Sequence, residues 1–447
     1  MKQLPSKIIG SAYRSGHAWT TLKELVDIGN RMAGQEGEER GIGVIESSFE
    51  QTGLDNISIS KFGIPGWWRG LSKLSIPVQD KTYERSHEII ALPGTPSKEV
   101  TAPLINVGYG RPKDFETTDI EGTICLVSSD TPNDFGRWIH RGEKYGMAIE
   151  QGAVGFVFRN HLEGCLPPTG NIGSDGPGKI PAVGISKELG DRLVRYTKKG
   201  KFELNLELKC RNNQTLSRNI EGTLGPNTKT EVVVSAHVDS HDIAEGARDN
   251  GAGSAVVCEV ARMLSKIENH LDTKVRFLIF GAEEIGLFGS YHWVEHREED
   301  SLKCIINNDG LGRSRDLEVD TNTFSTISQA FEDASDNLGL DIDINEGISP
   351  NSDHWPFIQK GIPGARMGSK ATVSGRGWGH THGDTLDKID PRDIRDSVIG
   401  LAASVLILAS KETTIEHKEP KEIANAFDPS LKEGIQARGD WPFENVE

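Results

Sequence analysis

Three short apolar runs in the second half of the chain are each followed by a polar residue able to bind a metal or carry a proton. The runs are residues 232–236, 275–280 and 304–306, and their length and composition are typical of strands buried on both faces of a sheet. Apolar periodicity predicts helices between and after them, at about 251–267, 287–295, 326–337 and 391–408. This alternation predicts an α/β fold with a Rossmann-like, mostly parallel sheet flanked by helices.

The polar residues after these runs are His237, Glu283 and Asp309. Ligands of open α/β sheets bind just outside the carboxyl ends of the strands, so we expect the three side chains to meet in one crevice. Short polar motifs supply three further candidates. They are Asp249 in "GARDNGAG", Glu284 directly after Glu283, and His380 in "GWGHTHGDT".

Five of these six side chains, two imidazoles and three carboxylates, are too many ligands for one tetrahedral zinc ion with an open position. They suit two ions that share a bridging carboxylate. Glu283 and Glu284 are adjacent at a strand end and should point in different directions. One of them can therefore bind a metal while the other accepts a proton from water.

The order His-x-Asp, Asp-Asn-Gly, Glu-Glu, Asn-Asp-Gly, Ser-Asp-His and His-x-x-x-Asp-Thr resembles the zinc exopeptidases related to aminopeptidase Y and carboxypeptidase Q. The likeness covers nearly the whole chain. It implies two Zn²⁺ per chain and a general base that activates water. The implied roles are His237 and Asp309 on the first ion, Asp249 bridging both ions, Glu284 and His380 on the second ion, Glu283 as the base, and Asp239 orienting His237.

Two histidines compete for one ligand position in "GHTHGDT". The family spacing selects His380 over His382 and leaves His382 or Asp384 to support the site. The segment 349–357 resembles the Ser-Asp-His loop of the family, with Asp353 beside the site and His354 in its wall. The remaining histidines considered lack a matching motif and are interpreted as surface or packing residues: His140, His161, His241, His292 and His296.

The resemblance implies hydrolysis of terminal peptide bonds in small peptides, by an enzyme of the aminopeptidase or dipeptidase type. A carboxypeptidase, an amide hydrolase similar to glutaminyl cyclases, and a non-catalytic homologue are the alternatives. Taken alone, Asp249 would be read as a helix N-cap and the Glu283-Glu284 pair as a solvated turn. Six motifs in family order favour the catalytic interpretation.

The strand and turn pattern changes between about residues 84 and 213, where short apolar strands alternate with Gly/Pro-rich connections. This part resembles the protease-associated (PA) domain inserted in many such enzymes. The expected division is 1–83 for the start of the catalytic domain, 84–213 for the insertion, 214–410 for the main catalytic part and 411–447 for a charged C-terminal tail. The tail is too polar for a core of its own, so we expect it to wrap the surface or to be partly disordered.

The composition and charge of the chain narrow the classes of partner that it is expected to bind. The net charge of −16 argues against nucleic acid, and the longest apolar run falls short of a membrane span. The N-terminal residues have no apolar signal core, and five scattered cysteines argue against a disulfide framework. We therefore expect a cytoplasmic enzyme acting on small peptides without membrane attachment. A homodimer is compatible with these features, and the oligomeric state stays open.

Overall fold

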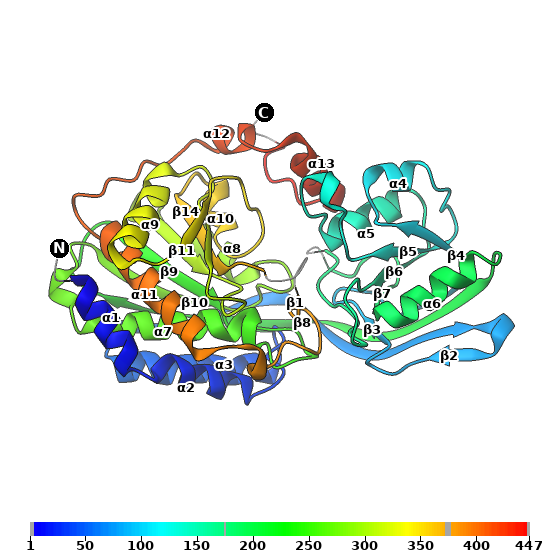
Figure 1. The fold of residues 1–447 in the computed structure, drawn as a ribbon, viewed down its shortest axis with the longest axis horizontal. Helices are drawn as coiled ribbons and strands as arrows, with labels where there is room; N and C mark the ends of the chain where they lie inside the picture. Colours follow the sequence, from blue (N-terminus) through cyan, green and yellow to red (C-terminus); the bar gives the residue numbers. More distant parts are fainter. Residues whose placement is uncertain (1–3, 174–175, 372–376, 445–447) are drawn as a thin grey trace.

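The computed structural model describes residues 4–173, 176–371 and 377–444. The chain forms a larger and a smaller lobe that lie side by side (Figure 1). The larger lobe contains the main α/β sheet and the helices that flank it. The segment that forms the smaller lobe lies, in the sequence, between two parts of the larger lobe. The predicted α/β fold with a central sheet flanked by helices is confirmed.

The three predicted strands lie next to one another in the sheet of the larger lobe. They are β9 (Glu231–His237), β10 (Lys274–Phe280) and β11 (Leu302–Asn308), and β9 pairs in parallel with both neighbours. The strand order is β13-β12-β14-β11-β9-β10-β8. The outer strands are β8 (Glu203–Leu224), β12 (Leu317–Asp320), β13 (Ile342–Asn345) and β14 (Gly364–Ser369).

Both faces of these strands are buried, which explains their continuous apolar sequences. Val232 and Phe277 face one side, where the main hydrophobic core lies, and Val233 and Leu278 face a smaller cluster on the other. The helices that pack with the main core are α1 (Leu4–Arg14), α2 (His17–Val26), α3 (Glu36–Thr52), α7 (Ala252–Ser265), α9 (Ser325–Leu338) and α11 (Pro391–Leu408). The other face is covered by α8 (Phe288–Glu295) and α10 (Trp355–Gln359).

In the smaller lobe the strand order is β4-β5-β6-β7-β3, and β4 pairs with β8, so these strands continue the sheet of the larger lobe. One hydrophobic cluster consists entirely of residues from the smaller lobe apart from the nearby Ala437. The elements are β2 (Lys81–Tyr83), β3 (Ile89–Ala91), β4 (Lys98–Gly108), α4 (Pro112–Glu116), β5 (Ile124–Ser128), α5 (Arg141–Glu150), β6 (Gly155–Arg159), β7 (Ala182–Ile185) and α6 (Lys187–Thr197).

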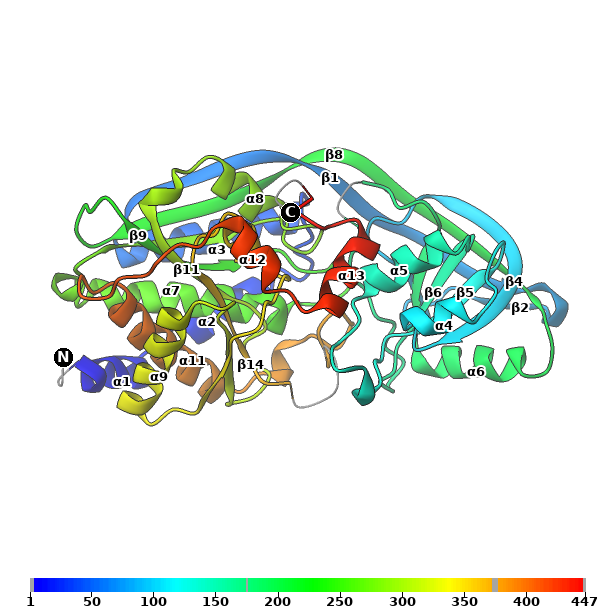
Figure 2. The same cartoon turned by 90° about the horizontal axis from the view of Figure 1, so that it is seen from above.

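Two long antiparallel strands join the lobes. β1 (Asp55–Ile76) pairs with β8 along most of its length, and the pair arches from one lobe into the other (Figure 2). The sequence predicts only a short strand at 57–62 here. Residue 213, where we expect the insertion to end, lies inside β8. The lobes are therefore connected by continuous hydrogen-bonded strands, and the proposed residue boundaries between domains stay a prediction.

The C-terminal residues run from the larger lobe across to the smaller one (Figure 1). They form α12 (Pro420–Asn425) and α13 (Pro429–Arg438). Trp355 of the larger lobe packs edge-on against Phe427 and Phe443, and Trp441 stacks edge-on with both of those residues. The tail thus wraps the surface as expected, but it also adds buried aromatic side chains to the core.

All five cysteines lie within the described residues, and each is a free thiol there. Within the same described part, no helix combines the length and hydropathy that crossing a membrane requires.

Candidate metal centre

The six predicted residues converge at the carboxyl edge of the parallel strands. His237 ends β9, Asp309 directly follows β11, and Glu283 and Glu284 follow β10 after a two-residue turn. Asp249 lies in the irregular turn before α7, and His380 lies in the loop before α11. The N-cap of α7 is Gly251 without a side-chain cap, so Asp249 does not cap this helix.

His237 is at the centre of the first group of side chains. Its Nε2 lies 3.5 Å from Oδ1 of Asp249, 3.7 Å from Oδ1 of Asp309 and 3.9 Å from Oε2 of Glu283. His237 is fully buried, whereas Glu283 and Asp309 retain some exposure. The first group is therefore open to a ligand on the side of Glu283 and Asp309.

His380 is at the centre of the second group. Its Nε2 lies 3.1 Å from Oδ2 of Asp249 and 3.2 Å from Oε2 of Glu284. The two carboxylate oxygens of Asp249 thus face two different histidines. This is the arrangement required of a carboxylate that bridges two metal ions.

The spacing and the unsatisfied atoms both fit zinc. Ligand atoms around a tetrahedral zinc ion lie roughly 3.3 Å apart, given bonds of about 2.0–2.2 Å. The separations within both groups are close to this value. Nε2 of His237 and Oε1 of Glu284 are buried without a hydrogen-bond partner among the described residues. Buried polar atoms are rarely left unpaired, so these atoms fit the ligands of a bound cation.

The charges at the centre shift its pKa values in opposite directions. Burial lowers the pKa of His237, but Glu283 and the other surrounding carboxylates outweigh it and raise the pKa well above its usual range. Burial also raises the pKa of Glu283 well above normal, and the carboxylate of Glu284 adds to this effect. For Glu284, burial is outweighed by His241 and His380, which lower its pKa. The excess of negative charge favours a cation, and Glu283 is the carboxyl group most disposed to hold a proton.

Asp239 supports both halves of the centre. Its two carboxylate oxygens accept hydrogen bonds from the backbone N–H groups of Glu283 and Glu284, each at 3.1 Å. Its Oδ1 also lies 3.4 Å from Nδ1 of His237, and its backbone oxygen lies 3.1 Å from the same nitrogen. Asp239 therefore orients both the turn that carries Glu283 and Glu284 and the imidazole of His237.

The two histidines of "GHTHGDT" lie in different surroundings. His382 is held away from the centre, with Nδ1 2.8 Å from the carbonyl oxygen of Ile243 and Nε2 3.1 Å from that of Ser86. Asp384 accepts hydrogen bonds from the backbone N–H groups of Arg248 and Asp249. Of the two, His380 is therefore the histidine that lies among the candidate ligands, and Asp384 fixes the turn that carries Asp249.

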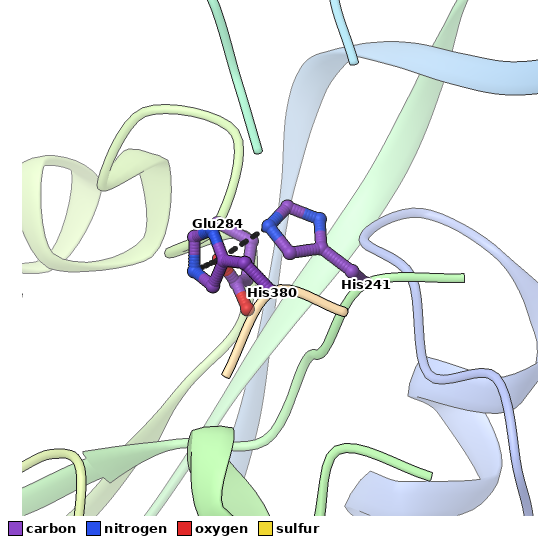
Figure 3. Close-up of side chains that lie close together, drawn as sticks. All are labelled: His241, Glu284 and His380. Atoms are coloured by element: carbon purple, nitrogen blue, oxygen red, sulfur yellow. Dashed lines mark ion pairs between the residues drawn. The ribbon is translucent and has the colours of Figure 1, made fainter. Parts of the chain in front are cut away.

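His241 lies at the centre although sequence reasoning placed it on the surface or in packing. It is buried, its Nε2 is 3.0 Å from Oε2 of Glu284, and its ring stands edge-on to that of His380 at 4.3 Å (Figure 3). The signal that could have found it is its position, four residues after His237 in the loop that leaves β9. No family motif includes it, so only the three-dimensional structure shows the contact.

The remaining predicted side chains lie outside the two groups, some beside the centre and His161 in the smaller lobe. Asp353 is buried and accepts a hydrogen bond from Ser290, and burial raises its pKa to about 7. His354 is also fully buried, and it lines neither of the two cavities that flank the centre. His140 and His292 face a cavity beside the centre, and His161 lies 2.7 Å from the hydroxyl of Ser129 in the smaller lobe.

Two cavities flank the metal centre. The larger, of about 770 Å³, reaches Glu283, Glu284 and His380 and lies between the two lobes. The second, of about 550 Å³, reaches Asp309 and is lined by three arginines. Asn351 lines both.

Comparison with known proteins agrees with the fold and the centre. Residues 219–405 match peptidase family M28, and residues 100–193 match the PA domain. Aminopeptidase YwaD of Bacillus subtilis is 33% identical over 97% of this chain and 91% of its own length. Carboxypeptidase Q of Rattus norvegicus is 24% identical over 88% and 86% of the two chains.

The solved structure of a zinc aminopeptidase from Bacillus subtilis, BSAP, superposes with a TM-score of 0.70. It is 30% identical and covers 93% of this chain and 98% of that one. Fold, ligand set and relatives together define a zinc-dependent exopeptidase with an inserted PA domain. The chain belongs to peptidase family M28.

Proposed function

We propose that this enzyme removes N-terminal residues from short peptides with two zinc ions bound at the metal centre. We infer the number of ions from the orientation of Asp249, because one of its oxygens faces His237 and the other faces His380. The similarity to aminopeptidases of Bacillus subtilis supports the choice of the N-terminal bond. His237, Asp309 and Asp249 would hold one ion, and Glu284, His380 and Asp249 the other.

When bound, the zinc ions polarise the scissile carbonyl and lower the pKa of the attacking water. Glu283 accepts the proton of that water and later delivers it to the nitrogen of the leaving amine. Burial raises the pKa of Glu283 above its usual range, which favours the uptake of a proton from water by this carboxylate. Asp239 keeps Glu283 in place through the backbone N–H.

The second cavity favours carboxypeptidase activity as the alternative. Arg137, Arg313 and Arg366 line it, beside the ligand Asp309. Arg137 already pairs with Glu143, and Arg366 with Glu318 and Asp320. A guanidinium group can also bind a second carboxylate, such as the free C-terminus of a peptide. Such a contact is expected in a carboxypeptidase, whose substrates end in a free carboxylate beside the scissile bond.

A panel of short peptides with free or blocked termini separates these functions. N-terminal acetylation should abolish hydrolysis if the enzyme is an aminopeptidase, whereas C-terminal amidation should abolish it in a carboxypeptidase. Elemental analysis of the same sample should approach about two zinc ions per chain. Hydrolysis that persists with no bound zinc, or after complete chelation, would contradict the proposed mechanism.

A further inference from the structure

The larger cavity is closed on one side by the C-terminal residues. We name residues 419–443 the C-terminal strap. Ile435, Arg438 and Trp441 of the strap line this cavity together with Arg141 of the smaller lobe and the catalytic Glu283. The cavity of about 770 Å³ is therefore bounded by the metal centre, the smaller lobe and the strap. Its size is within the range of about 300–1,000 Å³ found for sites that enclose small ligands.

The strap is fixed to the larger lobe. Phe427 and Phe443 pack edge-on against Trp355, with ring centroids 5.7 and 6.1 Å away. Nη1 of Arg438 also donates a hydrogen bond to Oδ1 of Asn351 at 3.2 Å. Asn351 lies in the loop that carries Asp353 and faces both cavities. The strap is thus positioned directly beside the substrate space.

The strap is also fixed to the smaller lobe, where α13 packs against α5 (Figure 2). Arg137 donates hydrogen bonds to the hydroxyl and the carbonyl oxygen of Ser430 at 2.8 and 2.7 Å, and it pairs with Glu143 at 2.8 Å. The backbones approach closely at Gly146. A Cβ atom there would lie 1.9 Å from the carbonyl oxygen of Ala437. Only glycine at this position allows α13 of the strap to pack this closely against α5.

We propose that the C-terminal strap is a specificity-determining wall, which restricts the enzyme to short peptides by blocking the extension of a longer chain out of the larger cavity. Ile435, Arg438 and Trp441 are the residues that contact the substrate side of this wall. The inference rests on the proposed peptidase function and specifies its substrate class. It assigns the tail a role in selecting substrates in addition to its packing.

Gly146→Ala tests the wall without altering a residue that lines the cavity. The new methyl group collides with backbone, so α13 must move away from α5. Gly43→Ala in α3 is the matched control, because a Cβ there meets nothing within 4 Å. A second variant ends after Lys418 and lacks the strap entirely. All proteins are assayed on free peptides of two, four, six and eight residues with the same N-terminal residue.

We expect Gly146→Ala to raise kcat/KM for the octapeptide relative to the dipeptide on the order of tenfold, because the transition state for the long substrate no longer meets the wall. The truncated enzyme should show the same change or a larger one, and Gly43→Ala should match the wild type. If either strap variant still cleaves the dipeptide but keeps the wild-type length profile, the proposal is wrong. Failure of the wild-type enzyme to cleave any peptide of the series would instead contradict the proposed function.

Discussion

The two lobes bury charged groups in contrasting ways. In the smaller lobe, Lys144 is fully buried, and its ammonium group donates to the carbonyl oxygens of Ser128 and Asp130 at 2.8 Å each. At the metal centre of the larger lobe, Nε2 of His237 and Oε1 of Glu284 are buried without a hydrogen-bond partner among the described residues.

The difference shows that buried polar groups have different meanings depending on whether their hydrogen bonds are satisfied. A charge whose hydrogen bonds are satisfied by nearby backbone stabilises one local conformation. A group of buried ligand atoms without partners carries a free-energy cost that the fold itself does not offset. Such a group indicates a ligand, and here its chemistry indicates zinc. Substitutions in the two lobes should therefore differ in kind: loss of catalysis or metal in one, and altered stability in the other.

The largest effect on catalysis alone should come from Glu283→Gln. The amide retains the shape of the side chain but cannot accept a proton, so kcat should fall on the order of 10²–10⁴-fold. Zinc content and thermal stability should match the wild type. Kinetics and elemental analysis on one preparation measure all three quantities. Near-normal activity would exclude Glu283 as the base.

Glu284→Gln is the matched control for that result, because it changes the adjacent carboxylate in the same way. Glu284 faces His380 at 3.2 Å and is proposed to bind the second ion. This variant should lose activity and zinc together. If Glu283→Gln loses zinc while Glu284→Gln retains it, the two roles must be exchanged.

A smaller effect is expected from His241→Ala. His241 contacts Glu284 at 3.0 Å and is interpreted as a positioning residue that acts through this ligand. Loss of such support costs about 10–100-fold in metal affinity. Zinc titration against a competing chelator should show that shift, and excess zinc should restore much of the activity. An unchanged zinc affinity would place His241 in packing only, as the sequence alone suggests.

The smallest effect should come from Lys144→Met in the other lobe, and it should concern stability. Burial lowers the pKa of Lys144 to about 7, whereas an unfolded lysine titrates near 10.4. Between these values the native state binds fewer protons than the unfolded state, so this group makes stability rise with pH. The variant should flatten that rise in thermal unfolding between about pH 7 and 10 without changing zinc content. Lys201→Met, at an exposed lysine, should leave the pH dependence unchanged. If Lys144→Met keeps the full rise of stability with pH, Lys144 is not the source of that rise.

Much of the larger lobe could be predicted because its signals are local. Three apolar runs predict β9, β10 and β11, and a parallel sheet brings their carboxyl ends to one edge. The residues that follow the strands must then lie close together. The family resemblance added Asp249 and His380, whose loops reach the centre from elsewhere in the chain.

The sequence by itself therefore determined the fold class, the peptidase family and the set of side chains at the strand ends. Their chemistry depends on residue type and their convergence on strand direction, and both can be read along the chain. The contact of His241 with Glu284, the continuous strands between the lobes and the seat of the C-terminal strap were decided only by the tertiary structure. These features depend on long-range packing, such as Gly146 against Ala437, which no periodic pattern within either segment specifies.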